Sequence, residues 1–320
     1  MSRALREGEK ARLHAPPNPW VGALVVDSSG VVVGEGHTQV PGEAHAEVVA
    51  LRHAGERARG STLVVTLEPC CHVGRTGPCT EAILDAGVSR VVGALADPDP
   101  RVAGRGFAAL REAGVEVVTG VGAELVRTSL APYLWQRVTG RPYVVAKVAS
   151  TLDGMVAMVD GSSQWITSAE ARADAHLVRA QSQAIVVGAG TVRADNPSLT
   201  ARLDDVVLEP LRVVLGEAPE GARVHPCVEW RESLPGLLDE LGARDVVQVL
   251  VEGGPRVLSS FVEAGLVNHL VWYLAPGLAG GSGSLSALTS LSTSSISELR
   301  RGRIVDVRRV GPDLRVDLEV

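Results

Sequence analysis

Short β-branched runs that alternate with helical segments are the feature that most limits the possible folds of this chain. In the first half, the runs LVVT (63–66) and VVGAL (91–95) are separated from one another and from earlier strands by helical patterns such as AHAEVVALRHAG (44–55). A second alternation begins with YVVAKVA (143–149) and continues through AIVVG (184–188). Strands that alternate with helices build layered α/β domains, and we expect mostly parallel sheets.

A short segment rich in Arg, Gly and Pro, RVTGRPY (137–143), is the best candidate for a domain boundary. A chain of 320 residues is long enough for two domains, each with its own core. We therefore expect one domain over residues 1–140 and another over 141–320. The Gly-, Ser- and Thr-rich stretch 280–297 predicts a mobile loop, and the final runs RIVDVRRV and LRVDLEV predict a closing hairpin.

Composition and charge argue against several classes of protein. The net charge of −6 is mild, and the chain shows no basic face of the kind that binds a phosphate backbone, so we expect no nucleic-acid partner. The chain contains no run of 18 apolar residues, the length that could span a membrane. Its charged N-terminus lacks the apolar core of a signal peptide. We expect a cytoplasmic protein. In a reducing compartment, four cysteines indicate metal ligands or inert thiols rather than disulfides.

The strongest chemical signal comes from His45, Glu47, Cys70 and Cys79. A hydrolytic zinc site needs three protein ligands and one open position for water, and one imidazole with two thiolates supplies such a set. Glu47 can take a proton from the activated water and return it to a leaving amine. Base deaminases carry H-x-E followed by P-C-x-x-C. Here eight residues separate the two cysteines, and the longer loop brings His72 to the rim of the site.

The residues alone leave other interpretations of this set open. A structural zinc usually has four protein ligands, and His72 or Cys71 could supply the fourth. Cys71 could also replace Cys70 as a ligand, although the Pro69–Cys70 junction favours Cys70. We interpret the set as catalytic because an acid stands beside three ligands in a strand–loop–helix context. We interpret Cys227 as an inert thiol.

The second half lacks a complete dinucleotide fingerprint. The strand AIVVG leads into a predicted loop, GAGTVRADNP, in which Arg193 replaces the last glycine of the fingerprint. A better candidate for a dinucleotide-binding turn is VLVEGGP (249–255). There a predicted strand ends in Glu252, two glycines follow, and Pro255 opens a helix. Glycines allow a ligand to approach the backbone, and amides at a helix start can bind a pyrophosphate. Taken alone, the pair predicts only a tight turn.

Eight strings, in order along essentially the whole chain, resemble the bifunctional riboflavin-biosynthesis deaminase–reductase family. They are PNPWVGALVV, HAEVVAL, TLEPCCHVGRTGPC, DPDPRVAGRG, KVASTLDG, SQWITS, GAGTVRADNPSLTARL and LVEGGP. The resemblance implies a cytidine-deaminase-like three-layer domain followed by a dihydrofolate-reductase-like α/β domain.

The same resemblance implies a function. The first domain would be a zinc-dependent deaminase of 2,5-diamino-6-ribosylamino-4(3H)-pyrimidinone 5′-phosphate. The second would reduce the ribosyl side chain with NADPH to give 5-amino-6-(5-phospho-D-ribitylamino)uracil. The implied cofactors are Zn²⁺ and NADPH, the implied partner is a small phosphorylated pyrimidine, and the family habit is a homo-oligomer.

Two other functions remain to be weighed. One is deamination of a different nucleoside or specialised metabolite with a repurposed reductase domain, against which the complete second half argues. The other is a non-catalytic binding protein, against which the intact His45, Glu47, Cys70 and Cys79 argue.

The resemblance also implies roles for individual residues. In the deaminase, substrate would contact Asn18, His37, His72 and Arg75. Arg75 stands where the family usually has Lys, and either cation could hold a phosphate. Cys71 stands where the family usually has Ser.

For the reductase, the resemblance implies two sets of contacts. Cofactor would contact Ser150, Trp165, Thr167, Thr191, Asp195 and Gly254. Substrate would contact Lys147, Ser163, Arg179, Leu199, Arg202 and Glu252. Arg179 and Arg202 could clamp a phosphate, and either Lys147 or Glu252 could assist with the proton. We interpret Asp153 as a turn residue.

Overall fold

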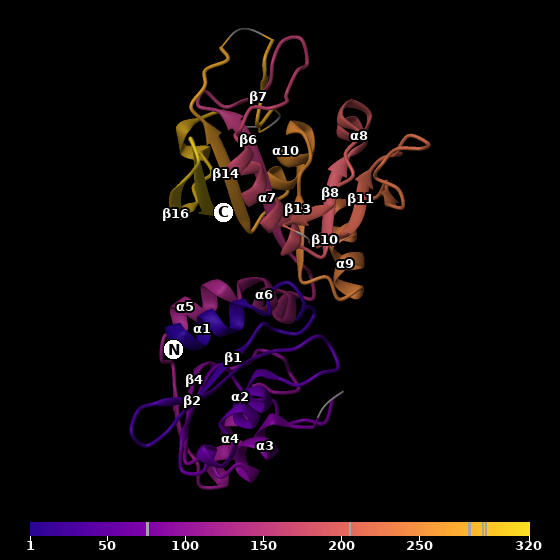
Figure 1. Ribbon diagram of the computed structural model, residues 1–320. Helices are drawn as coiled ribbons and strands as arrows, with labels where there is room; N and C mark the ends of the chain where they lie inside the picture. The colour runs from indigo at the N-terminus through magenta and orange to yellow at the C-terminus, as the bar shows by residue number, and fades with distance from the viewer. Residues whose placement is uncertain (75–76, 205, 281–282, 290, 292) are drawn as a thin grey trace. The chain divides into compact units, whose positions relative to one another are not determined.

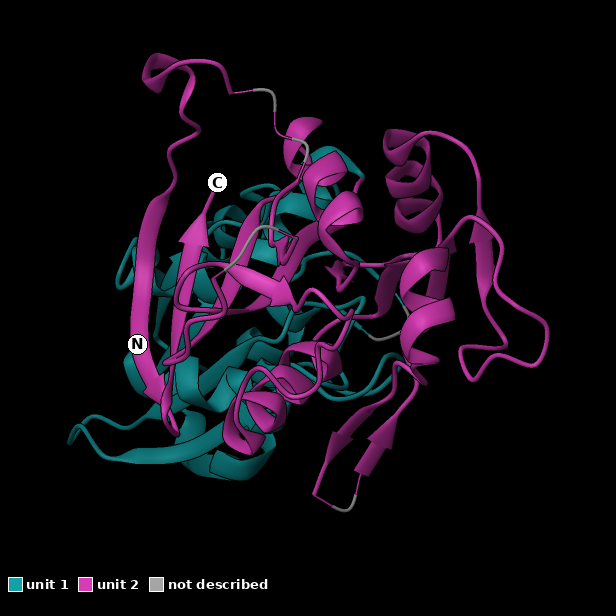
Figure 2. Cartoon of the chain, turned by 90° about the horizontal axis from the view of Figure 1, so that it is seen from above, with its two compact units in different colours: residues 1–140 teal, residues 141–320 magenta. Residues whose placement is uncertain are grey.

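The computed structural model describes residues 1–74, 77–204, 206–280, 283–289, 291 and 293–320 (Figure 1). The chain divides into two compact units, Met1–Gly140 and Arg141–Val320 (Figure 2). Each unit has its own main sheet and its own helices. Within the described ranges, every helix is too short or too polar to span a membrane.

The sheet of the first unit is mixed. Its five strands follow the order β2-β1-β3-β4-β5. They are β1 (Gly22–Val26), β2 (Val32–His37), β3 (Thr62–Leu67), β4 (Arg90–Leu95) and β5 (Glu116–Thr119). β1 pairs antiparallel with both β2 and β3, whereas β3, β4 and β5 run parallel. The prediction of a mostly parallel sheet is wrong here, because the short β1–β2 turn can join only antiparallel strands.

Helices cover both faces of this sheet, which gives the three-layer arrangement. Those of the first unit are α1 (Ser2–Glu9), α2 (Ala46–Ala54), α3 (Cys79–Asp85), α4 (Arg105–Glu112), α5 (Ala123–Ser129) and α6 (Ala131–Thr139), with a 3-10 turn η1 (Gly55–Ala58). Glycines let two helices approach the hairpin from opposite sides. A Cβ on Gly22 would lie 1.8 Å from the Ala4 carbonyl oxygen of α1, and one on Gly36 would lie 2.4 Å from that of Ala46 in α2.

The second unit is built on an eight-stranded sheet with the order β12-β11-β8-β13-β6-β14-β17-β16. Its strands are β6 (Tyr143–Thr151), β8 (Ala184–Gly188), β11 (Leu211–Leu215), β12 (Val228–Trp230), β13 (Gln248–Val251), β14 (His269–Ala275), β16 (Arg303–Val310) and β17 (Asp313–Glu319). In this order, each pair of neighbouring strands from β12 to β14 runs parallel, as predicted for the second half of the chain. β17 runs antiparallel to β14 and β16, which confirms the closing hairpin.

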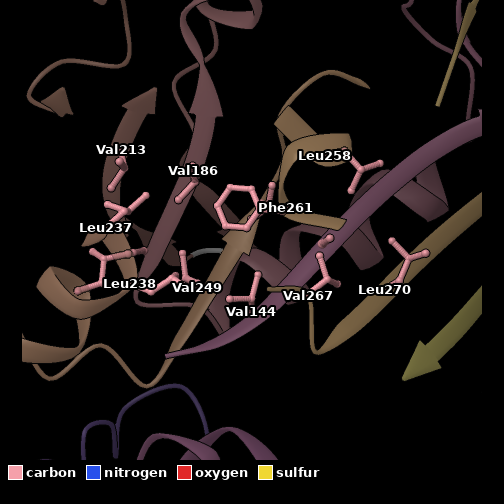
Figure 3. Packing of buried hydrophobic residues seen from close by; sticks show 14 of the residues in the cluster. Val144, Val186, Val213, Leu237, Leu238, Val249, Leu258, Phe261, Val267 and Leu270 are labelled. Atoms are coloured by element: carbon pink, nitrogen blue, oxygen red, sulfur yellow. The ribbon is translucent and has the colours of Figure 1, made fainter. Parts of the chain in front are cut away.

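Helices cover both faces of the parallel part of this sheet, namely α7 (Ala169–Ala180), α8 (Ala189–Asp195), α9 (Leu234–Ala243) and α10 (Pro255–Glu263). Successive side chains along each strand point to opposite faces of the sheet. Val144, Val186 and Val249 pack with Leu237 of α9 and Phe261 of α10 (Figure 3). Their neighbours Val145, Ile185 and Leu250 pack with Ala171 of α7 and Val192 of α8. Burial on both sides explains why these strands are apolar throughout.

Two predicted loops contain regular structure. Residues 189–195 form α8, which ends at Asn196 with a left-handed φ of 41°. The glycines that open this segment and the Asn196–Pro197 pair that follows it are typical of a loop, which is why the helix was not predicted. The stretch 280–297, of which 281–282, 290 and 292 lie outside the described residues, contains β15 (Leu285–Ser286) and part of a 3-10 turn, η2 (Ile296–Glu298). β15 pairs with β7 (Met155–Ala157), and a second small ladder joins β9 (Ala201–Leu203) to β10 (Val206–Leu208).

Candidate zinc and reductase sites

Three separate elements bring the predicted zinc ligands together. His45 is the N-cap residue of α2, Cys70 follows β3, and Cys79 is the first residue of α3. Nδ1 of His45 lies 3.3 Å from Sγ of Cys79 and 3.5 Å from Sγ of Cys70. Tetrahedral zinc, with bonds of about 2.0 Å to nitrogen and 2.3 Å to sulfur, separates such atoms by roughly 3.5 Å. The spacing of the donor atoms therefore fits zinc.

Without metal, the three donor groups have pKa values that are shifted in different directions. A hydrogen bond from the Cys79 thiol lowers the pKa of Cys70 to about 4. The same hydrogen bond and burial raise the pKa of Cys79. The hydrogen bond to Cys70 also raises the pKa of His45. Because metal ligands must be deprotonated thiolates and neutral imidazoles, a divalent cation entering this set would displace protons.

Glu47 lies in the first turn of α2 and is only 4% exposed. Burial raises the pKa of its carboxyl to about 7, against the opposing influence of His45. A carboxyl that titrates near neutrality can both accept and return a proton. Its position, two residues beyond a ligand and buried beside the set, suits proton transfer.

The structure does not bring His37 to the zinc ligands. His37 pairs with Gly22 across the β1–β2 hairpin, and that face of the sheet is covered by α1. Its Nδ1 lies 2.9 Å from Oε1 of Glu7 in α1, whereas α2 covers the opposite face at Gly36. The alternation of side chains along β2 was the signal for this orientation, because neighbours in a strand point to opposite faces.

The other predicted contacts of the deaminase substrate lie in loops. Asn18 is half-buried ahead of β1, with its backbone N–H bonded to the Ala15 carbonyl. His72 is half-buried in the loop between the cysteines, and its buried Nδ1 has no hydrogen-bond partner among the described residues. An unpaired buried nitrogen is available to a ligand. Arg75 lies outside the described residues.

In the second unit, Lys147, Arg179 and Glu252 form one cluster. Glu252 directly follows β13 and its carboxylate is buried. Arg179 of α7 donates to it from Nε and Nη2 at 2.7 to 3.1 Å. Nζ of Lys147 in β6 lies 3.8 Å from the same carboxylate. Burial alone would raise the pKa of Glu252, but the two cations outweigh it and lower that pKa. Glu252 is therefore held ionised.

His176 and Thr200, which sequence reasoning missed, extend this cluster to Arg202. Arg179 donates to the Thr200 carbonyl at 3.2 Å, and Arg202 donates to the Thr200 hydroxyl at 3.1 Å. Nε2 of His176 lies 3.1 Å from Nη2 of Arg202. Burial and the two arginines lower the pKa of His176 to about 4. Its signal was helical spacing, because His176 and Arg179 are three residues apart on α7.

Leu199 can offer a ligand only its backbone. Its side chain is buried in the core, and its φ of 54° lies in the left-handed region, which residues other than glycine rarely adopt.

An open cavity of about 370 Å³ lies beside β6 and contains two of the predicted residues, Ser163 and Trp165. Its lining is Thr151, Met158, Ser162, Ser163, Gln164, Trp165, Ile166, Ala275, Pro276 and Gly277. The Trp165 side chain is 68% exposed, and the Arg172 guanidinium carbon lies 4.3 Å from the centroid of its ring. An exposed indole beside a guanidinium can stack on a flat ring such as a nucleotide base.

The turn before α10 joins two more predicted cofactor residues, since Gly254 N–H donates to the Thr191 hydroxyl at 3.2 Å. Gly253 must be glycine, because a Cβ there would lie 2.4 Å from Cβ of Val257. The amides that open α10 can bind phosphate, so the residues of this turn fit a dinucleotide such as NADPH.

The remaining predicted cofactor residues are less accessible or lie apart from this turn. Ser150 is fully buried, and its hydroxyl accepts from Trp272 Nε1 at 2.8 Å and donates to the Thr151 carbonyl at 2.9 Å. Thr167 is buried before α7, and Asp195 is the exposed last residue of α8.

Comparison with known proteins identifies the family. Residues 1–95 match the family model of the cytidine and deoxycytidylate deaminase zinc-binding region, and residues 142–316 match the RibD C-terminal domain. The chain is 43% identical to the riboflavin biosynthesis protein RibD of Mycobacterium tuberculosis, over 99% of this chain and 96% of that one. It is 38% identical to RibD of Escherichia coli, over 99% of this chain and 98% of that one. The chain belongs to the RibD family.

A solved RibD-family structure has the same fold over the whole chain. It is the diaminohydroxyphosphoribosylaminopyrimidine deaminase/5-amino-6-(5-phosphoribosylamino)uracil reductase of Thermotoga maritima, 33% identical, with a TM-score of 0.88 and coverage of 100% of this chain and 97% of that one. Membership confirms the predicted cytidine-deaminase-like and reductase folds. It also makes this chain a bifunctional riboflavin-biosynthesis enzyme that uses zinc and NADPH, and sets aside the alternative of a repurposed reductase.

Proposed function

We propose that residues 1–140 deaminate 2,5-diamino-6-ribosylamino-4(3H)-pyrimidinone 5′-phosphate and that residues 141–320 then reduce its ribosyl side chain. The final product would be 5-amino-6-(5-phospho-D-ribitylamino)uracil. The name of the Thermotoga relative, a deaminase and reductase of such pyrimidines, supports this assignment. The observation that carries it is the three-donor set of His45, Cys70 and Cys79 with the buried Glu47 beside it.

For the deaminase, His45, Cys70 and Cys79 hold zinc, which when bound supplies a water activated at neutral pH. The water oxygen would bond to C2 of the pyrimidine, the bond from C2 to its amino nitrogen would break to release ammonia, and the 5-amino group would remain. Glu47 takes the proton from the attacking water and delivers it to the leaving nitrogen. We assign Asn18 and His72 to the pyrimidine and Arg75 to the phosphate, and we leave His37 out of this set.

For the reductase, bound NADPH would supply a hydride to the ribosyl carbon that is bonded to the exocyclic 6-amino nitrogen. The bond from that carbon to the ribose ring oxygen breaks, and a proton goes to that oxygen. Glu252 is held as a carboxylate by Arg179, so Lys147 is the better source of the accompanying proton. Arg179 is occupied by Glu252 and Thr200, which leaves Arg202, an exposed side chain, as the main phosphate contact. Ser163 and the backbone of Leu199 complete the proposed substrate contacts.

We assign the cofactor to the cavity beside Trp165 and to the turn before α10. Trp165 and Arg172 offer a stacking surface, and Gly254 and Thr191 offer an amide and a hydroxyl at that turn. Ser150, Thr167 and Asp195 complete the proposed cofactor set, with Ser150 acting from within the sheet.

We also propose a cytoplasmic homo-oligomer that binds no nucleic acid. The mild net charge of −6 and the family habit of the RibD proteins support this proposal.

Replacing Glu47 by Gln tests the deaminase assignment. The variant should keep zinc, because the three ligands remain, but should release no ammonia, because an amide cannot shuttle the proton. Zinc content is measured by elemental analysis and ammonia by an enzyme-coupled assay. Reduction of pre-deaminated substrate should be unchanged, and that reaction is the internal control for folding. Ammonia release at the wild-type rate would remove Glu47 from the mechanism.

A further inference from the structure

The loop that carries Cys70 spans residues 68–78, between the end of β3 and the start of α3. Among its described residues, Val73, Gly74 and Gly77 are exposed, with Val73 at 79%. On one side, backbone N–H groups of α3 donate hydrogen bonds to Cys70. Cys79 N–H donates to Sγ of Cys70 at 3.3 Å, and Thr80 N–H donates to its carbonyl at 3.2 Å. These two contacts fix Cys70 to one helix, and a second attachment is needed to fix it relative to the sheet.

Glu68, two residues before Cys70, supplies that second attachment. Its side chain is buried, with 4% of the residue exposed. Oε2 accepts from the backbone N–H groups of Asp97 at 3.1 Å and Gly104 at 2.9 Å. Oε1 accepts from those of Gly106 at 2.8 Å and Phe107 at 3.1 Å. One carboxylate thus connects the end of β3 to the segment after β4 and to the first turn of α4.

The contact continues through the residue between Glu68 and the ligand. A Cβ on Gly106 would lie only 2.0 Å from the Pro69 carbonyl oxygen, so α4 lies directly against this turn. Three of the four N–H donors belong to the segment DPDPRVAGRG (97–106), which has no part in either proposed reaction.

We propose that Glu68 is a positioning residue of the zinc site. By binding four amides of the 97–107 segment, it holds Sγ of Cys70 at the separation from His45 that tetrahedral zinc requires. This inference rests on the proposed role of Cys70 as a zinc ligand. Both oxygens accept two N–H groups each, so an amide cannot replace the carboxylate, because its NH₂ group would face two donors.

Cobalt binding to the metal-free protein tests the proposal, because Co²⁺ spectra report the thiolate ligands and the tetrahedral geometry without any turnover. Glu68→Gln should change the visible and thiolate-to-cobalt bands and weaken cobalt binding at least about tenfold, as outer-shell partners of metal ligands commonly do. Glu81→Gln is the charge control, since the exposed Glu81 lies two residues after the other cysteine ligand. Leu110→Ala is the stability control, since it removes a buried side chain from α4 itself.

The outcomes separate the two proposals. A changed spectrum and weakened binding in Glu68→Gln, with wild-type spectra in both controls, support the positioning role. A wild-type spectrum and affinity in Glu68→Gln, with only a lower melting temperature, would overturn it. If wild-type protein itself shows no thiolate-to-cobalt bands, the zinc site of the proposed function fails instead.

A second variant covers the case in which Glu68→Gln does not fold. Glu68→Asp keeps the charge but is one methylene shorter, so it reaches only some of the four donors. Cobalt affinity between that of wild type and a tenfold loss, with shifted bands, is expected. Wild-type spectrum and affinity in Glu68→Asp would overturn the proposal.

Discussion

Glu252 shows how one buried carboxylate organises a site. It accepts from Arg179, lies close to Lys147, and affects the pKa of His176. Because it is ionised and buried, each cation around it is partly neutralised. Arg202 lies at the exposed edge of this cluster, where its side chain contacts the Thr200 hydroxyl and the His176 ring rather than a carboxylate.

Replacing Glu252 by Ala should leave Arg179 buried without its partner. Removal of one member of a buried ion pair costs about 3 to 5 kcal/mol, because the remaining charge is uncompensated. We expect the second unit to unfold at a lower temperature and reduction to be lost, with deamination retained. Calorimetry and separate assays measure the two effects.

Glu240→Ala is the matched control, because Glu240 pairs with Arg244 on the exposed surface of α9 at 2.7 Å. Exposed pairs contribute about 1 kcal/mol or less. Equal destabilisation by the two substitutions would contradict the role given to Glu252.

Individual site residues could be predicted where their chemistry depends on short spacings along the sequence. His45, Glu47, Cys70 and Cys79 could be named because a zinc hydrolase needs that donor set. Thr200 could not, since it joins the site only when α7 and the residues before β9 pack together, and the only signal for His176 was its spacing from Arg179 on α7. Glu68 was equally hidden, because its four partners are backbone amides that carry no sequence signal.

At the scale of elements, a network of charged side chains joins β14, β17 and α7. Asp317 of β17 accepts from His269 at 2.9 Å and from Arg315 at 2.7 Å. Arg315 also donates to Asp174 of α7 at 2.7 Å. Burial alone would raise the pKa of Asp317, but these partners outweigh it and lower the pKa to about 2. The closing hairpin is therefore attached to the unit by charge as well as by strand pairing.

The network predicts a pH-dependent contribution to stability. A carboxyl whose pKa is lower in the folded than in the unfolded chain stabilises the fold above its unfolded pKa of about 3.9, and loses that contribution as the pH falls. Asp317→Asn should therefore destabilise the second unit by about 2 kcal/mol at pH 7. The difference from wild type should narrow below about pH 4 and close near pH 2.

Denaturant unfolding at a series of pH values measures this difference. A constant gap between wild type and Asp317→Asn from pH 7 to pH 2 would show that the lost contact is not that of an ionised carboxylate.

Elements with strong patterns were predicted well, and short or weakly patterned ones were not. Those predicted from such patterns are β3, β4, β6, β8 and β13 and the helices α2 and α10. α1, α5 and α6 were missed, and α8 was predicted as a loop, because the glycines and the Asn–Pro pair of GAGTVRADNP are typical of loops. The antiparallel pairing of β1 with β3 is a long-range choice that neither strand specifies by itself.

At the scale of the whole molecule, the chain has two units, each with its own core and its own group of chemically suited side chains. The overall amino-acid composition reveals neither function, because it is an average over two units that carry different reactions. The division into two units also means that each activity can be removed separately.

The products formed from the diaminopyrimidine phosphate test the central claim most directly. Purified protein is incubated with this substrate, with and without NADPH, and the products are identified by mass spectrometry. Without NADPH we expect only the deaminated pyrimidine with its ribosyl group intact. With NADPH we expect the deaminated ribityl product, and Glu47→Gln should leave the substrate unchanged in both. A reduced product that still carries the 2-amino group, or ammonia release that needs NADPH, would contradict two consecutive sites.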